Sequence, residues 1–123
     1  MPGPTRNAAK DRSRAYRGQG GSAGRALVEL PATGCALPVP PMPAGRDWSA
    51  HEEDLWESLW SGPQANAWDD SFIPTVAVFV IYNTAVMQGA ASAWMAQELR
   101  HAAQALGLTP SGMAALGWKI ADR

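Results

Sequence analysis

Residues 70–107 read DSFIPTVAVFVIYNTAVMQGAASAWMAQELRHAAQALG, and after Asp70 the next charged side chain comes only 28 positions later. We predict one long helix here. Asp70 or Ser71 can cap its first turn, Pro74 is tolerated in that turn, and Gly107 supplies the left-handed residue that commonly ends a helix. Such a helix of about 35 residues would be roughly 50 Å long, so the rest of the chain must be arranged along it.

The two halves of this predicted helix differ in the pattern of their apolar residues. In the first half, from Ile73 to Ile81, apolar side chains point in every direction, whereas the second half has one apolar face. That face is formed by Met95, Leu99, Ala102 and Leu106. The first half must therefore be surrounded, and three covers compete: neighbouring subunits, lipid, or the rest of this chain.

The remaining sequence indicates an all-α fold of one small domain. Residues 1–47 are rich in proline and have little apolar periodicity, so we expect a disordered basic and Pro-rich arm. Residues 48–123 form the predicted helical oligomerisation domain, resembling a helical hairpin built on the long central helix. A core of about 76 residues is marginal alone, and oligomerisation is a common remedy.

Sequence signals place three further helices around the central one. Ser49 and Glu52 form a capping box, which predicts a helix that ends near Ser61. A short helix follows from Pro63. Thr109 precedes a proline at the first helical position, and this pair begins a last helix over roughly residues 110–121. No strand is expected in the folded part.

Charge is distributed unevenly between the arm and the body. Residues 1–25 contain six basic residues and one acidic residue, a net charge of +5, whereas residues 26–123 have a net charge of −6. A basic arm on an acidic body is typical of a tail that contacts nucleic acid or an acidic partner, and a solubilising tail is the alternative. The candidate nucleic-acid-binding residues are Arg6, Lys10, Arg12, Arg14, Arg17 and Arg25.

No catalytic motif is evident. The chain lacks a phosphate loop, a dinucleotide-binding fingerprint, CxxC and HExxH, and its two histidines and Cys35 have no reason to converge. We therefore expect no enzyme activity, no catalytic residue, no metal and no cofactor. A single cysteine and the absence of an apolar signal segment agree with a cytosolic protein.

The apolar surface of the central helix predicts where subunits meet. Two flanking helices can cover only two sides of it, and the uncovered remainder would exceed the apolar patch that soluble monomers tolerate. The predicted oligomer interface comprises Val76, Phe79, Val80, Met87 and Trp94.

The main rival is a single-span membrane protein, because residues 71–97 are 27 consecutive uncharged residues and about 20 suffice to cross a bilayer. Polar residues within the segment and the lack of a basic cluster beside it weaken this reading.

Several short segments, in succession, resemble the small subunits of phage terminases of actinobacterial phages and prophages. They are the opening Met1-Pro-Gly-Pro4 with the basic residues after it, Trp48-Ser49 leading into Leu55-Trp56-Glu57-Ser58-Leu59-Trp60, Pro63-Gln64-Ala65 with Ala67-Trp68, and Leu106-Gly-Leu-Thr-Pro110 with Met113, Leu116 and Trp118. Each segment is short, and their order along the chain carries the resemblance.

The resemblance implies a non-enzymatic partner of a DNA-packaging motor. Members of this family bind viral double-stranded DNA, assemble into homo-oligomeric rings and hand the genome to a large subunit that holds the ATPase and nuclease. The host cell cytoplasm would be the site of action. A small phage DNA-binding regulator without a packaging role is a second rival to this assignment. One departure matters, because many members carry an N-terminal helix-turn-helix and residues 1–47 contain none, which leaves DNA contact to the basic arm.

Overall fold

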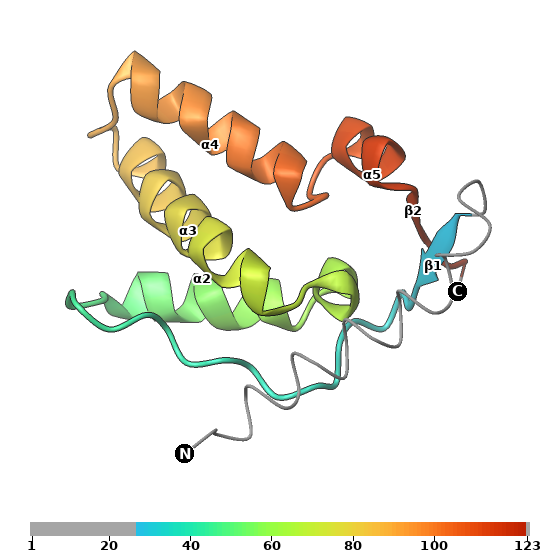
Figure 1. Cartoon of the computed structure of the whole chain (residues 1–123). Helices are drawn as coiled ribbons and strands as arrows, with labels where there is room; N and C mark the ends of the chain where they lie inside the picture. Colours follow the sequence, from blue (N-terminus) through green and yellow to red (C-terminus); the bar gives the residue numbers. More distant parts are fainter. Residues whose placement is uncertain (1–26, 123) are drawn as a thin grey trace.

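The structure, a computed structural model, describes residues 27–122 and is mostly helical. Three layers are visible in Figure 1: α2 lies beneath α3, and α4 lies along the other side of α3. The elements in chain order are β1 (Val28–Leu30), α2 (Ala50–Trp60), the 3₁₀ helices η1 (Pro63–Ala67) and η2 (Asp70–Phe72), α3 (Ile73–Met87), α4 (Ala93–Ala105), α5 (Pro110–Leu116) and β2 (Trp118–Ile120).

The predicted single long helix is wrong, because residues 88–92 form a turn that folds the chain into the α3–α4 hairpin. Gly89 has a φ of 71°, a left-handed conformation that ends α3. Ser92 then caps α4, since its hydroxyl accepts a hydrogen bond of 3.1 Å from the backbone N–H of Met95. Folding back lets α4 cover α3, a contact that a continuous rod could not make.

Several predicted helix ends are confirmed. Ser49 and Glu52 form the reciprocal capping box at the beginning of α2. Thr109 caps α5 with Pro110 as the first helical residue. Gly107, with a φ of 72°, follows the end of α4.

A two-stranded parallel sheet interrupts the otherwise helical fold. β1 pairs with β2 in the register Val28 to Trp118 and Leu30 to Ile120. The predicted last helix is therefore too long: it ends at Leu116, where Gly117 adopts a φ of 75° and turns the chain into β2. The strand pair was missed because three-residue strands leave too short a pattern in the sequence.

Residues 34–47, which we call the strap, also differ from the expected disordered arm, because they pack along α2 (Figure 1). The strap runs antiparallel to α2 and is hydrogen bonded at both ends and between. Its bonds are Cys35 N–H to Ser61 O at 2.9 Å, Asn66 Nδ2 to Gly34 O at 3.1 Å, Trp56 Nε1 to Pro40 O at 2.7 Å and Trp48 Nε1 to Pro43 O at 3.0 Å. Proline carbonyls accept these indole bonds, which a scan for apolar periodicity does not detect. The remainder of the predicted arm, residues 1–26, lies outside the described residues.

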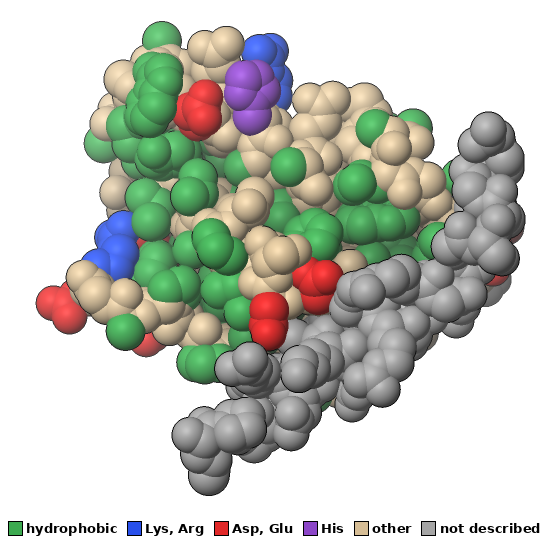
Figure 2. All heavy atoms as spheres, viewed as in Figure 1, with side chains coloured by type: hydrophobic (Ala, Val, Ile, Leu, Met, Phe, Trp, Pro, Cys, Tyr) green, Lys and Arg blue, Asp and Glu red, His purple; other side chains and the backbone are tan. Residues whose placement is uncertain are grey.

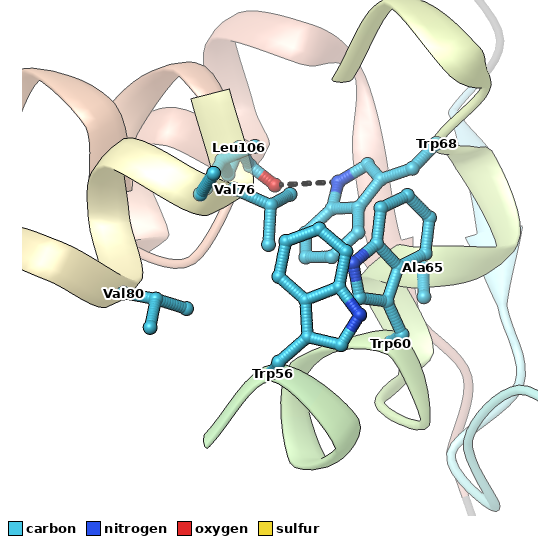
Figure 3. Packing of buried hydrophobic residues seen from close by; sticks show 8 residues of the cluster. Trp56, Trp60, Ala65, Trp68, Val76, Val80 and Leu106 are labelled. Atoms are coloured by element: carbon cyan, nitrogen blue, oxygen red, sulfur yellow. Dashed lines mark hydrogen bonds between the residues drawn. The ribbon is translucent and has the colours of Figure 1, made fainter. Parts of the chain in front are cut away.

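The core is built on three tryptophans, as their helical spacing indicates (Figure 3). Trp60 lies between Trp56, with ring centroids 5.7 Å apart, and Trp68, whose ring meets it edge-on at 5.0 Å. The indole N–H of Trp68 donates to the carbonyl oxygen of Leu106 over 3.1 Å, which ties the core to the end of α4. Val76 and Val80 of α3 close the cluster and have no exposed surface.

Candidate functional site

The root of the basic arm is held by the strand pair. The backbone N–H of Val28 donates to the carbonyl of Gly117 over 2.8 Å, and that of Ala121 donates to Leu30 over 2.9 Å. Leu30 is fully buried. The six predicted DNA-binding residues, Arg6, Lys10, Arg12, Arg14, Arg17 and Arg25, all lie outside the described residues, but the chain that carries them joins the body at this fixed point.

The surface of α2 is acidic. Glu52 is buried and belongs to the capping box, and it also forms an ion pair with Arg46 at 3.4 Å. Glu53, Asp54 and Glu57 are exposed. The exposed side of α2 is therefore negatively charged.

The two histidines and Cys35 lie in different parts of the described chain. Within residues 27–122, no group of three or more His, Cys, Asp or Glu side chains is placed to hold a metal ion. His51 is exposed in the first turn of α2, and His101 lies on α4 with its Nδ1 atom 3.5 Å from Glu98. Cys35 lies in the strap against the tryptophan core.

The predicted oligomer interface divides into buried and exposed residues. Val76 and Val80 are buried inside one chain, so they have no surface with which to meet a neighbour, and their assignment to the interface is corrected. Phe79 is half-buried and packs against the core. Met87 and Trp94 are exposed, at 70% and 60% of their surface. The turn at residues 88–92 explains the difference, because the hairpin gives α3 a second helical neighbour that the long-rod prediction did not supply.

The outer side of the hairpin leaves apolar surface without cover. A groove of about 310 Å³ runs between α3 and α4, and its lining includes Pro74, Val78 and Ala105. Val78 is 39% exposed. Towards the turn, the ring of Trp94 meets that of Tyr82 edge-on with centroids 5.9 Å apart. We call the exposed apolar side chains Met87 and Trp94, on either side of the turn, the hairpin surface. Val78 lies nine positions before Met87, on the opposite side of α3, and does not belong to it. Green side chains are visible over both helices in Figure 2.

Sequence reasoning missed the groove, and one signal would have found it. Gly89 followed by Ser92 combines a helix-ending residue with a helix-capping residue only three positions apart. Reading that pair as a turn places Val78 of α3 opposite the residues of α4 that line the groove.

The same turn shortens the segment that could span a membrane. In the described part of the chain, the segment Asp70–Met87 is long and apolar enough to cross a bilayer by length and composition. This segment replaces the longer candidate, residues 71–97, that the sequence suggested. Within the fold, Val76, Ala77 and Val80 of this segment pack against the tryptophan core.

One protein family matches both the arm and the helical body. A family model described as phage terminase small subunit matches residues 1–121. The chain belongs to the phage terminase small subunit family. No curated protein and no solved structure matches it significantly. The family assignment that the short segments indicated is therefore confirmed, and a role in phage DNA packaging follows from it at the level of the family.

Proposed function

We propose that this terminase small subunit binds viral double-stranded DNA, assembles into a homo-oligomeric ring and assists a terminase large subunit during genome packaging in the host cell cytoplasm. The observation that carries the proposal is the extent of the family match, because it includes both the basic arm and the whole helical body. The three roles below are assigned to separate parts of the chain.

DNA binding is assigned to the arm on grounds of charge. Residues 27–122 contain three basic and ten acidic residues, a net charge of −7, so the body as a whole repels DNA. The arm carries the opposite charge and leaves the body at β1. Contacts between basic side chains and phosphates are independent of sequence, so binding is expected to be weak per subunit and strongly salt-dependent.

Assembly is assigned to the hairpin surface. α3 is strongly apolar, the tryptophan core covers the side that carries Val76 and Val80, and α4 packs along another side. Met87 and Trp94 remain largely exposed. A neighbouring subunit that covers this surface makes a heterologous contact, and such contacts close into a ring when the rotation between subunits permits.

Assistance to the large subunit follows from what the chain lacks. It has no phosphate loop that could hold ATP. The energy-requiring and DNA-cleaving steps of packaging are therefore assigned to the partner, and the small subunit delivers the DNA.

The DNA-binding role is tested by replacing all six basic residues of the arm with glutamine and measuring binding to duplex DNA by fluorescence anisotropy at several salt concentrations. The slope of log K against log salt is negative. If each of the six residues contacts one phosphate, the variant's slope is less steep by about 5. A shuffled arm with the same composition is the matched control and retains binding. Unchanged binding by the glutamine variant would place the DNA surface on the helical body and contradict the proposal.

A further inference from the structure

A second pocket, distinct from the apolar groove, lies where α4 meets α5. It has a volume of about 410 Å³, and every residue that lines it is polar. Arg100, His101 and Gln104 come from α4, whereas Thr109 caps α5 and Ser111 lies in its first turn.

Hydrogen bonds hold the floor of this pocket in place. Gln104 Nε2 donates to Ser111 Oγ over 3.1 Å, which joins α4 to α5. Thr109 Oγ1 accepts from the backbone N–H of Gly112 over 2.9 Å and lies 3.4 Å from Ser111 Oγ. Gln104, Thr109 and Ser111 are thus linked to one another before any ligand arrives, which lowers the entropy cost of ordering these three side chains on binding.

The guanidinium of Arg100 is the positive charge of the pocket, whereas the other basic side chain, His101, contacts the carboxylate of Glu98. Among the described residues, no carboxylate forms an ion pair with Arg100, whereas Arg46 is paired with Glu52. No carboxylate lines the pocket. Glu98, which contacts His101, lines the apolar groove instead. An anion is therefore favoured here over a cation.

We propose that this pocket binds a phosphate group of the DNA backbone, with Arg100 as its charged ligand and Gln104 and Ser111 as neutral donors. Arginine, glutamine, serine and threonine side chains are among the groups that contact phosphates in protein–DNA complexes. The guanidinium offers five N–H donors in a planar fork that suits phosphate oxygens. This inference rests on the proposed DNA-binding function and adds to it a contact on an otherwise acidic body.

The pocket is joined to the root of the arm by a short stretch of chain. α5 begins at the pocket and leads through Gly117 directly into β2. β2 pairs with β1, which is the root of the arm. The pocket and the arm root therefore lie at the two ends of a single short unit, α5 with the strand pair (Figure 1).

The test measures the salt dependence of duplex DNA binding by the full chain and by Arg100→Gln. Loss of one phosphate contact makes the negative slope of log K against log salt less steep by about 0.9. Lys119→Gln is the matched control, because it removes one exposed positive charge from β2 outside the pocket. We expect Lys119→Gln to retain the slope of the unmodified chain.

A second variant separates hydrogen bonding from charge. The double substitution Gln104→Ala with Ser111→Ala removes two neutral donors, so it weakens binding several-fold without changing the salt slope. If the unmodified chain binds DNA but Arg100→Gln matches it, or if Arg100→Gln and Lys119→Gln make the slope less steep by the same amount, the pocket is not a phosphate site and the arm alone binds. If the unmodified chain does not bind duplex DNA at all, the proposed function itself fails and the pocket fails with it as a DNA contact.

Discussion

The indole N–H of Trp56 donates to the carbonyl oxygen of Pro40 over 2.7 Å, a buried hydrogen bond between residues 16 positions apart. It holds the middle of the strap against α2. Because the arm and β1 are continuous with the strap, this bond also helps to fix the point from which the basic residues leave the body.

Replacement of Trp56 by phenylalanine is expected to lower the free energy of unfolding by at least about 2 kcal/mol, since the buried carbonyl of Pro40 loses its donor and the smaller ring leaves space in the core. Trp48→Phe is the matched control. Its partner carbonyl, on Pro43, is only part-buried, so water can replace the lost donor and the cost is smaller. Urea unfolding followed by circular dichroism measures both. Equal losses would show that the buried bond to Pro40 adds nothing.

Two glycines with positive φ are expected to differ in their tolerance of alanine. At Gly89, with φ 71°, an added Cβ meets nothing within 4 Å, so only the backbone cost of about 1 kcal/mol applies. At Gly107, with φ 72°, the same Cβ would also overlap the indole ring of Trp118. Gly107→Ala therefore destabilises the protein more than Gly89→Ala in thermal unfolding. The reverse order would mean that Trp118 does not pack against the end of α4.

Substitutions on α3 and α4 are expected to separate folding from assembly. Met87→Asp and Trp94→Asp place a charge on exposed positions, so the chain should stay folded while the mass of the assembly falls towards that of the monomer. Val80→Asp buries an unpaired carboxylate in the core at a cost of several kcal/mol, and we expect it to unfold. Light scattering coupled to size exclusion, with circular dichroism, distinguishes the two results. An assembly of unchanged mass for both exposed variants would place the subunit contact elsewhere.

Purified protein is expected to hydrolyse no ATP and to leave DNA intact in the presence of Mg²⁺ or Mn²⁺. The sequence has no phosphate loop, and residues 27–122 bring no three metal-ligating side chains together. Phosphate release and plasmid integrity are the measurements, with a mock purification from cells that lack the protein as control. Activity that follows the protein through successive columns would contradict this expectation.

Local signals in the sequence were sufficient where the cause of a structure is itself local. The capping box at Ser49, the Thr109-Pro110 helix start and the helix end at Gly107 are each set by hydrogen bonds or backbone angles within a few residues. The tryptophan core could also be predicted, since Trp56 and Trp60 lie four positions apart on one helical face. The family resemblance depended on the order of such short segments along the chain.

Tertiary structure decided what depends on contacts between distant segments. The turn at residues 88–92 is favoured because it lets α4 cover one side of α3, and this packing energy does not appear in the local propensity of an apolar run. The parallel pairing of β1 with β2 joins residues about 90 positions apart, so no local pattern specifies it. The assignment of Val80 to the core and of Met87 to the surface follows from those contacts, because an all-apolar helix has no periodicity that indicates which side is covered.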